Sequence, residues 1–388
     1  MRIAILLNAP YPSGMASTNR VHLYAKGLLS CSNDVCIFIP KPTENAGKVR
    51  NTAVSGEFEG IKYYYGHNTT VRSTSFLGRR TDDFFSLFRT LSLMIRYKPS
   101  IVLVVGSPLQ YILLGKIASA ITSSKYIREK SEIPFSHVKK LSFLQKLRIK
   151  AEYRLFDGIL VISKTLGDFY QKEMSLKTKT FDIPILIDSD KINPDYHLSE
   201  KVKPNLVYTG SLLNNKDGVL TIIKAFFKII QKNTDFNLYM TGDINTTPDK
   251  DEILRLIRDL NLNERIFLLG YISKEKLLDL TSTATALLLA KPDNRQNRYN
   301  MATKIGEYLI TGRPVIVSNV DPVSRYLSNK TDALLVNPDE DDFAKAIEFI
   351  IENPGEANII GQKGKSSALR FFDYKFHALR MNEFLKSL

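Results

Sequence analysis

The sequence is poor in the residues that build disulfide frameworks and zinc sites. Its 388 residues include two cysteines, Cys31 and Cys36, and five histidines that show no metal-ligand spacing. These counts exclude a disulfide scaffold and a cysteine-rich zinc site, and they predict a protein that binds no metal ion. A reducing compartment is the default expectation.

Long uninterrupted apolar runs are also missing. The apolar start Ile3–Leu7 stops at Asn8, so it predicts a first strand and not a secretory signal. The run from Pro99 to Gly115 is interrupted by Gly106 and Pro108, and it predicts a strand, a loop and a helix start, not a membrane span. We therefore expect a cytoplasmic protein.

Glycine-rich nucleotide fingerprints are absent as well. Residues 8–14, which follow the first strand, contain no G-x-G-x-x-G, and this argues against a nicotinamide enzyme. Residues 361–366 imitate a phosphate-binding loop, but Ile359 stands where the first glycine is required and no strand precedes it. We interpret this segment as a solvated turn, and we expect no cofactor.

Positive charge is concentrated in the first part of the chain. The net charge is +14, and residues 1–150 hold 22 Lys and Arg against 8 Asp and Glu, whereas residues 151–388 hold 32 of each. All of the excess therefore falls within the first 150 residues. This asymmetry predicts a polyanionic partner for that part: a membrane surface, nucleic acid or an acidic substrate.

Short β-branched runs alternate with helical stretches, which is typical of α/β domains built on parallel sheets. We predict strands at 2–7, 35–39, 61–65, 101–105, 126–129, 159–163 and 180–183, and again at 206–209, 237–241, 266–269, 286–289, 315–317 and 334–336. A polar stretch separates the two series. The fold class is therefore α/β, with two Rossmann-like domains facing across a cleft.

The domain boundaries follow from this pattern. We expect a first Rossmann-like domain over 1–188, a linker over 189–204, a second such domain over 205–371, and a last helix over 372–388. This helix follows an irregular link and is expected to pack back on the first domain. Such sheets bind ligands beyond the carboxyl ends of their strands, so a site is expected in the loops there.

The most informative segment runs from Asn300 to Ile316 and predicts a helix, a glycine C-cap and a buried strand. Asn300 can cap this helix and leave backbone N–H groups free for an anion. Thr303, Lys304 and Glu307 share one face, where a carboxylate can accept both hydroxyls of a ribose and the lysine can face a phosphate. A surface Lys–Glu pair is the structural alternative.

This segment resembles the donor-site helix of GT-B glycosyltransferases of family four. Further marks of that family occur in the expected order along nearly the whole chain, and the order is more specific than any single mark. They are Gly14 after the first strand, residues 157–163 before the linker, residues 207–218 opening the second domain, and residues 270–273, which match the loop that packs on the nucleotide base.

The resemblance implies a retaining transferase that moves a sugar from a nucleoside-diphosphate sugar to a hydroxyl acceptor without a metal ion. The first domain would take the acceptor side and the second the nucleotide sugar, in the assembly of a surface polysaccharide or glycolipid. The resemblance assigns the diphosphate to Lys216, the ribose to Glu307 and a close loop approach to Gly14. The remaining donor contacts are expected at Gly210, Ser211, Tyr271, Ile272, Arg298, Tyr299, Asn300, Thr303 and Lys304.

Two donor-side positions depart from the family pattern. Tyr299 stands where the first of two paired glutamates is usual, so the resemblance does not assign the residue that recognises the sugar. Ser211 stands in place of a common arginine, which leaves the diphosphate one cation short. Arg295 or Arg298, in the loop before the helix, can supply that charge.

A third departure concerns the acceptor side. The histidine that usually follows the fifth strand is missing, and the segment there carries Glu129 and Glu132 instead. We treat both glutamates as candidate catalytic residues that orient the acceptor or the sugar. A capping or salt-bridge role for each is the alternative.

Two functions of other classes remain open. A non-hydrolysing sugar-nucleotide epimerase shares the fold, but no histidine of this sequence sits at a predicted strand end of the second domain. A basic nucleic-acid-binding protein needs aromatics interleaved with cations, a setting that Tyr63, Tyr64 and Tyr65 lack. Conversion of donor without acceptor would identify the first, and salt-dependent binding of oligonucleotides the second.

The basic first domain is expected to bind an anionic membrane surface, peripherally on the inner face of the cell membrane, to reach a lipid-linked acceptor. Cations flank two apolar helical stretches, Phe84–Ile95 and the segment with Phe143, Leu144 and Leu147. They are Arg72, Arg79, Arg80, Arg89, Arg96 and Lys98 for the first stretch, and Lys139, Lys140, Lys146, Arg148, Lys150 and Arg154 for the second. The alternative is that both helices pack on their sheet and turn their charges to solvent.

Overall fold

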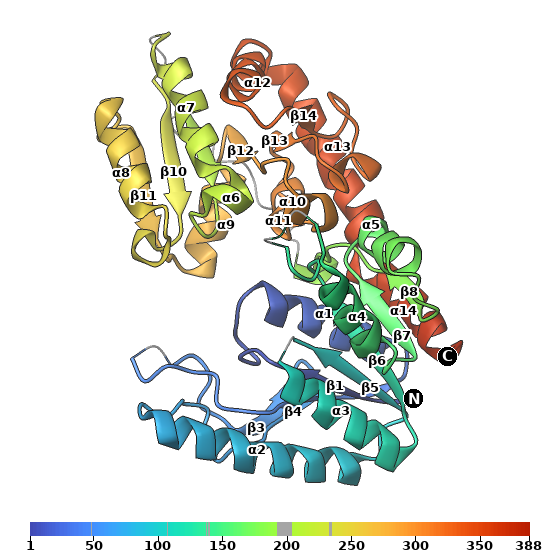
Figure 1. Ribbon diagram of the computed structural model, residues 1–388. Coiled ribbons are helices and arrows are strands. Elements are labelled where there is room, and N and C mark those ends of the chain that lie inside the picture. The colour runs from blue at the N-terminus through green and yellow to red at the C-terminus, as the bar shows by residue number, and fades with distance from the viewer. Residues whose placement is uncertain (48, 107, 137, 139, 192–203, 233–234) are drawn as a thin grey trace. The chain divides into compact units, whose positions relative to one another are not determined.

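The computed structural model describes residues 1–388 except 48, 107, 137, 139, 192–203 and 233–234. The described residues divide into two compact units, one made of Met1–Leu186 and Tyr374–Leu388 and the other of Ile187–Asp373. Each unit has its own parallel sheet (Figure 1). The predicted α/β class with two parallel-sheet domains is confirmed. Most of the predicted linker, 189–204, lies outside the described residues, as does Lys139.

The described part of the first unit contains one eight-stranded sheet. Its strands are β1 (Arg2–Leu7), β2 (Asp34–Ile39), β3 (Ser55–Phe58), β4 (Ile61–Tyr65), β5 (Ile101–Val105), β6 (Lys125–Lys130), β7 (Gly158–Val161) and β8 (Lys179–Asp182). They lie in the order β3-β4-β2-β1-β5-β6-β7-β8, and β3 pairs antiparallel with β4 whereas the other pairs are parallel. The central strands are buried runs of Ile, Leu and Val, as expected where helices cover both faces.

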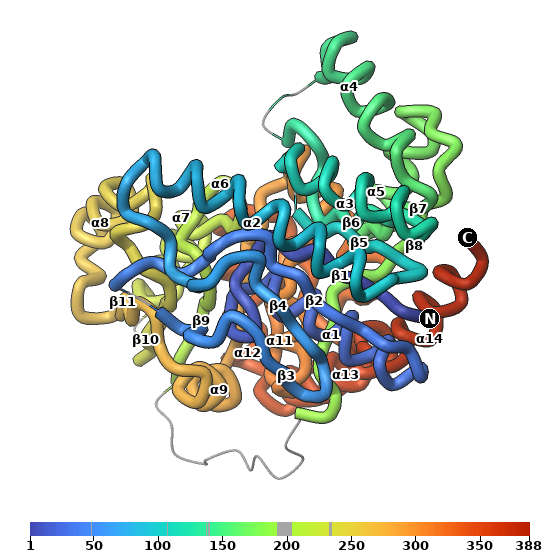
Figure 2. The backbone as a smooth tube through the Cα atoms, turned by 90° about the horizontal axis from the view of Figure 1, so that it is seen from below, coloured from blue at the N-terminus to red at the C-terminus, as the bar shows by residue number. Residues whose placement is uncertain are grey.

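Helices cover this sheet on two faces. They are α1 (Ala16–Ser30), α2 (Phe76–Tyr97), α3 (Leu109–Thr122), α4 (Phe143–Tyr153), α5 (Lys164–Asp168) with the π-turn Phe169–Glu173, and α14 (Tyr374–Lys386). The C-terminal α14 packs on α1 (Figure 2), and Asn33 Nδ2, in the turn after α1, donates to Asn382 Oδ1 of α14 at 2.9 Å. Right-handed crossovers place α1 on one face, and α2 and α3 on the other, since β1→β2 and β4→β5 run in opposite directions across the sheet.

The described part of the second unit contains a six-stranded parallel sheet in the order β11-β10-β9-β12-β13-β14. Its strands are β9 (Asn205–Tyr208), β10 (Asn237–Thr241), β11 (Ile266–Gly270), β12 (Ala286–Leu289), β13 (Val315–Ser318) and β14 (Leu334–Val336). Its helices are α6 (Asn214–Asp217), α7 (Val219–Ile230), α8 (Lys250–Asp259), α9 (Lys274–Ser282), α10 (Arg295–Tyr299), α11 (Lys304–Leu309), α12 (Glu340–Glu352) and α13 (Pro354–Phe372). Single 3-10 turns occupy Ser189–Lys191, Ile244–Thr246 and Val323–Arg325.

Helix α13 corrects two sequence-based expectations. The link before the last helix is not irregular, and residues 361–366 form no turn, because both lie within this 19-residue helix. Its glycines allow close packing: a Cβ on Gly361 would lie 2.3 Å from Gly312 O, and one on Gly364 would lie 2.5 Å from Asp332 O. Tertiary contact therefore outweighs the low helix propensity of these glycines.

Candidate functional site

The strand order of the second unit reverses beside β9. The chain runs outward from β9 through β10 to β11 and then returns to the other side of β9 with β12. Ligands of parallel sheets bind at such reversal points, beyond the carboxyl ends of the strands. The loops after β9 and β12 therefore mark the expected site, and the first unit has the same reversal between β1 and β5.

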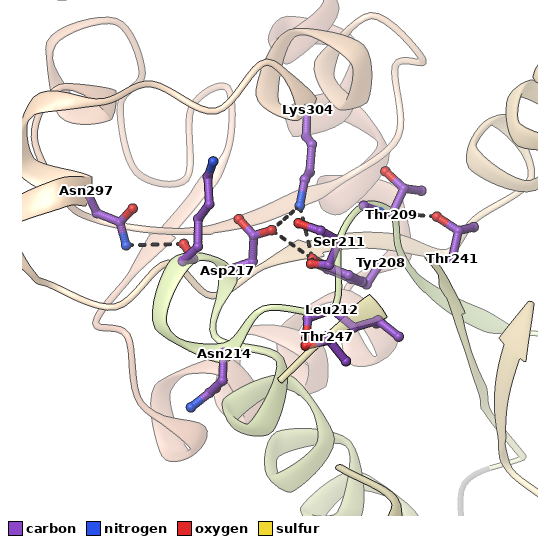
Figure 3. A network of polar contacts seen from close by, with 12 residues as sticks. Tyr208, Thr209, Ser211, Leu212, Asn214, Asp217, Thr241, Thr247, Asn297 and Lys304 are labelled. Carbon is purple, nitrogen blue, oxygen red and sulfur yellow. Dashed lines mark hydrogen bonds and ion pairs between the residues drawn. The ribbon is translucent and has the colours of Figure 1, made fainter. Parts of the chain in front are cut away.

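The loop after β9, residues 209–218, is held in place by neighbouring side chains (Figure 3). Backbone groups of Thr209, Gly210, Leu212 and Asn214 bond to the side chains of Tyr308, Thr241, Thr247 and Asp249, respectively, at 2.6–3.1 Å. These partners come from α11, β10 and the segment before α8. The loop is thus fixed from several sides before any ligand binds.

Two glycines let this loop lie close to its neighbours. Gly210 has φ +132°, and a Cβ there would lie 2.4 Å from Lys304 Nζ. Gly218 has φ +66°, and a Cβ there would lie 1.8 Å from Ala290 O. Both backbone conformations disfavour side chains, so glycine is required at each position for conformation as well as for space.

Lys304 and Asp217 form a buried ion pair at the centre of this network. Lys304 Nζ lies 2.6 Å from Asp217 Oδ2 and donates to the Tyr208 hydroxyl at 3.0 Å. The Tyr208 hydroxyl also lies 2.9 Å from Asp217 Oδ2 and 2.7 Å from Ser211 O (Figure 3). The pair therefore joins the start of α11 to the loop after β9. That Lys304 faces a phosphate stays a prediction.

Burial governs the protonation of this cluster. Desolvation lowers the pKa of Lys304, although Asp217 and Glu307 oppose the shift, and Lys216 lowers that pKa further by repulsion. Desolvation and the Asp217 charge raise the pKa of Tyr208 far above its ordinary value, so its hydroxyl stays protonated. These effects place Lys216 and Glu307 each within electrostatic reach of Lys304.

Lys216 lies in the short helix α6, which α10 holds. Asn297 Nδ2 donates to Lys216 O at 3.2 Å, and Asn294 Nδ2 donates to Asn215 O at 2.6 Å. The Lys216 side chain is half-buried. The loops after β9 and β12 are thus bonded to each other at the point where the strand order reverses.

Glu307 lies in the first turn of α11, and its side chain is exposed. Desolvation by the surrounding protein raises the pKa of the Glu307 carboxyl, and Lys304 and Lys274 oppose that rise. Solvent at an exposed side chain limits the size of such a shift. The carboxyl is therefore accessible to a ligand and borders the Lys304 network.

The segment before α11 differs from one expectation. Asn300 does not cap the Glu307 helix: α11 begins after Thr303, whose side chain makes no capping bond to the described residues, and Asn300 ends the short helix α10. Arg298 makes a two-point contact with Asp293, at 2.6 and 2.8 Å. Tyr299 is half-buried beside it.

Tyr271 and Ile272 follow β11, two strands away from β9 in the same sheet. The Tyr271 side chain is 59% exposed, and Ile272 is half-buried. Gly242 N donates to Gly270 O at 2.8 Å, which joins the loop after β10 to the end of β11. Tyr271 and Ile272 therefore lie at the same carboxyl edge as Gly210 and Ser211.

In the first unit, Gly14 lies in the loop between β1 and α1. A Cβ on Gly14 would lie 2.0 Å from Thr18 Oγ1, so the loop is closely packed there. Ser13 N donates to Asn51 Oδ1, and Asn51 Nδ2 returns a bond to Ser13 O, both at 2.8 Å. This reciprocal pair holds the β1 loop at the strand reversal of the first sheet.

Glu129, at the end of β6, forms a buried ion pair with Arg20 of α1. Arg20 Nε lies 3.0 Å from Glu129 Oε1, and Ser131 Oγ donates to the same oxygen at 2.6 Å. This is the salt-bridge arrangement that the sequence left open for Glu129. Glu132 lies in the following loop and is half-buried. Its catalytic role, like that of Glu129, stays a prediction.

Sequence reasoning missed Asp217, Tyr208 and Arg20. Asp217 lies next to Lys216 and before Gly218, but nothing local indicates that it pairs with Lys304, 87 residues away. Arg20 follows Ser17, Thr18 and Asn19 in α1, so nothing local indicates that it pairs with Glu129, 109 residues away. Over the part of the chain that the structure describes, no three His, Cys, Asp or Glu side chains are placed to hold a metal ion.

Solved structures with the GT-B fold are similar to this chain over its whole length. Sucrose-phosphate synthase from Thermosynechococcus elongatus is 16% identical, with a TM-score of 0.73, and the match covers 100% of this chain and 98% of the other. HepE from Anabaena, in complex with UDP and glucose, is 14% identical, with a TM-score of 0.73 and 100% coverage of both chains. The lipopolysaccharide outer core galactosyltransferase WaaB is 16% identical, with a TM-score of 0.65 and 100% coverage of both.

These likenesses define the class of the fold as GT-B. Residues 203–353, most of the second unit, match the family model described as glycosyl transferases group 1. The match over these residues, together with the GT-B fold, indicates a glycosyltransferase. A search of curated protein sequences found no match. Within the described residues, no helix is both long enough and apolar enough to cross a membrane.

Proposed function

We propose that this glycosyltransferase moves a sugar from a nucleoside-diphosphate sugar to a hydroxyl acceptor, with retention of the anomeric configuration and without a metal ion. The observation that carries the proposal is the arrangement of Lys216, Lys304 and Glu307 around the loop after β9. A cation and an accessible carboxylate at a strand reversal suit a diphosphate and a ribose. The HepE structure, which holds UDP and glucose, supports this ligand class.

Each residue then has a separate role. Lys216 stabilises the leaving diphosphate, whose negative charge grows as the glycosidic bond breaks. Glu307 accepts hydrogen bonds from the two ribose hydroxyls. Lys304 is a positioning residue, because Asp217 offsets its charge and the pair fixes the loop that presents Lys216.

The acceptor proton passes to a phosphate oxygen of the donor on the face where the sugar is transferred. The protein then supplies orientation and electrostatic stabilisation, and no side chain acts as a nucleophile. On the acceptor side we assign the orienting role to Glu132. Glu129 is bonded to Arg20 and Ser131, so we assign it to holding the first unit together.

The acceptor belongs, in this proposal, to a surface polysaccharide or a glycolipid under assembly. The similarity to WaaB, a lipopolysaccharide outer core galactosyltransferase, supports a lipid-linked saccharide. The same similarity supports our proposal that the enzyme is peripheral, on the inner face of the cell membrane.

A thermal-shift screen of nucleoside diphosphates tests the donor class, because a ligand that binds the native state raises the melting temperature by mass action. One nucleotide should raise it clearly, and a chelator should leave that shift unchanged. The anomeric configuration of the product with the matching sugar donor, read by NMR, should be that of the donor. Inversion, strict dependence on a divalent ion, or conversion of donor without acceptor would contradict the proposal.

A further inference from the structure

Helix α3 turns an apolar face to the outside of the first unit. Leu109, Leu113, Ile117 and Ile121 are spaced four residues apart, so they line one side of the helix, and each is 47–58% exposed. Lys116 is the one charged residue in the sequence of α3, and its ammonium donates to Leu155 O. A helix on the surface of a soluble domain ordinarily turns polar residues outward.

Helix α2 also turns large apolar side chains outward. It buries Ser86, Thr90 and Met94, and it exposes Phe84, Phe85 and Phe88 at 57–67%. Gly66 packs closely against this side of α2, because a Cβ there would lie 2.1 Å from Thr90 Oγ1 and 2.6 Å from Ser86 O. From the sequence, the alternative to membrane binding was that this apolar stretch packs on the sheet. In the structure its phenylalanines lie on the outside.

The two helices form one surface. They pack side by side on the same face of the sheet, at the lower edge of Figure 1. Their outward residues, with Phe76 and Leu77 at the start of α2, make a patch that we call the α2–α3 face. A contiguous apolar patch of this kind marks a binding surface in a soluble protein.

Charge identifies the partner. Six exposed cations lie on α2 or just outside its ends: Arg72, Arg79, Arg80, Arg89, Arg96 and Lys98. Two acids, Asp82 and Asp83, lie in the same helix, so the net charge of this region is positive. The surplus of the whole chain falls in the same 150 residues. Apolar side chains next to cations match a layer with an apolar interior and anionic head groups.

We propose that the α2–α3 face binds the surface of an anionic lipid bilayer. Its apolar side chains enter the boundary between head groups and acyl chains, and the arginines contact lipid phosphates. A second copy of the chain would bring two faces of the same positive charge together, which opposes association. The inference rests on the peripheral location in the proposed function and assigns the surface that binds, and its test needs no activity measurement.

The start of α4 repeats the pattern. Phe143, Leu144 and Leu147 are 53–79% exposed, and Lys140 and Lys146 are exposed next to them. Figure 2 shows α4 at an outer end of the first unit. The same combination of apolar and basic side chains thus occurs twice among the helices that follow β4, β5 and β6.

Vesicle co-sedimentation of the full chain tests the proposal. The vesicles are phosphatidylcholine alone, or phosphatidylcholine with phosphatidylglycerol, over a series of salt concentrations. The variants are Phe84→Ser/Phe88→Ser on α2, Leu113→Ser/Ile117→Ser on α3 and Arg79→Gln/Arg80→Gln. The matched control is Phe376→Ser/Leu379→Ser on α14, which covers the other face of the sheet and exposes both residues. All substitutions are at exposed positions, and thermal melts verify folding.

The wild type should bind the anionic vesicles, release with salt, and bind the neutral vesicles at least tenfold more weakly. Each apolar pair should weaken binding at least tenfold. The arginine pair should weaken it about 25-fold, since each cation near an anionic surface contributes about fivefold. The control should bind as the wild type does. Equal binding to both vesicles, no binding, or an equal loss in the control would overturn the proposal. So would a lipid-free dimer that Phe84→Ser/Phe88→Ser converts to monomers, because a second copy would then cover the face.

Discussion

The two units each contain a buried ion pair, and the two pairs are bonded differently. In the first unit, Arg20 donates to Glu129 and also to the carbonyls of Ile183 and Pro184, both at 2.6 Å. In the second, Lys304 bonds to Asp217 and the Tyr208 hydroxyl. The side chain of Arg20 is 6% exposed and that of Lys304 is 15% exposed.

The surroundings give the two pairs different roles. Arg20 links α1, the end of β6 and the segment after β8, so its guanidinium joins three segments in the buried interior of the first unit. Lys304 lies at a strand reversal, next to the exposed carboxyl of Glu307 and the half-buried Lys216. Buried ion pairs are weak evidence for stability by themselves, and what surrounds them decides their use.

The largest expected effect comes from breaking the first pair. Arg20→Met leaves the Glu129 carboxylate buried without its cation, and we expect it to lower the free energy of unfolding by about 3–5 kcal/mol. Arg20→Met/Glu129→Met should recover most of that loss, because both charges are then gone. Urea denaturation measures both.

The double variant also tests the role of Glu129. Once its stability has recovered, turnover should be close to that of the wild type. A folded but inactive double variant would return Glu129 to the acceptor site. Lys228→Met, which breaks the exposed pair with Asp341, is the control and should leave stability unchanged.

Breaking the second pair should cost somewhat less, because Lys304 is less buried. Lys304→Met should lower the free energy of unfolding by about 3 kcal/mol and reduce turnover, since Asp217 stays buried beside Tyr208. Adding Asp217→Asn should recover most of the stability. If Lys304 is a positioning residue, turnover should recover too, to within about tenfold of the wild type.

If stability recovers and turnover does not, Lys304 is more than a positioning residue. A Lys304→Met/Asp217→Asn protein with wild-type stability and turnover still at least about 100-fold low would show that Lys304 contacts the donor directly.

Exposed donor-site residues should affect activity without affecting stability. Glu307→Ala and Lys216→Ala should each lower turnover about 100-fold, as loss of a group that stabilises the transition state does. The free energy of unfolding should change by no more than about 0.5 kcal/mol in Glu307→Ala, because its side chain is exposed. Full activity in either variant would defeat the assignment of that residue.

The smallest effect concerns pH. A raised pKa means that Glu307 holds its proton more tightly in the folded protein, so its contribution to stability is present below the ordinary value of 4.5 and is lost as pH rises through the raised pKa. Ribose binding needs the ionised form, so nucleotide affinity should fall as pH drops through that same pKa, which lies above 4.5. The pH dependence of the nucleotide dissociation constant measures this loss of affinity at low pH, and Glu307→Gln should remove it. If Glu307→Gln still loses nucleotide affinity at low pH, the titrating group is another residue.

Most of the fold could be predicted from the sequence, and the failures have a common cause. Buried β-branched runs located the described parallel strands to within about two residues, because parallel strands are apolar on both faces. The exposed antiparallel strand β3 was missed. Helix α13 was missed because Gly361 and Gly364 reduce local helix propensity, whereas the contacts that favour them involve Gly312 and Asp332. Periodicity found the apolar residues of α2 but could not tell which side of the helix faces water.

The site also has residues that the sequence predicted and contacts that it did not. Lys216, Thr303, Lys304 and Glu307 lie within short motifs, and the structure places Lys216 and Glu307 each within electrostatic reach of Lys304. The two buried ion pairs were not predicted, because their partners are 87 and 109 residues apart in sequence. No local spacing encodes such a contact. It arises when the strand order carries two loops to the same edge of a sheet.

The most direct test of the donor site is a calorimetric cycle with two nucleotides and two proteins. The nucleoside diphosphate found by the thermal-shift screen and its 2′-deoxy analogue are titrated into the wild type and into Glu307→Ala. If Glu307 accepts a bond from the ribose, the wild type should bind the deoxy analogue about tenfold more weakly, as loss of a hydrogen bond to a charged group requires. Glu307→Ala should bind the two nucleotides equally. An equal preference for the ribonucleotide in both proteins would contradict the account.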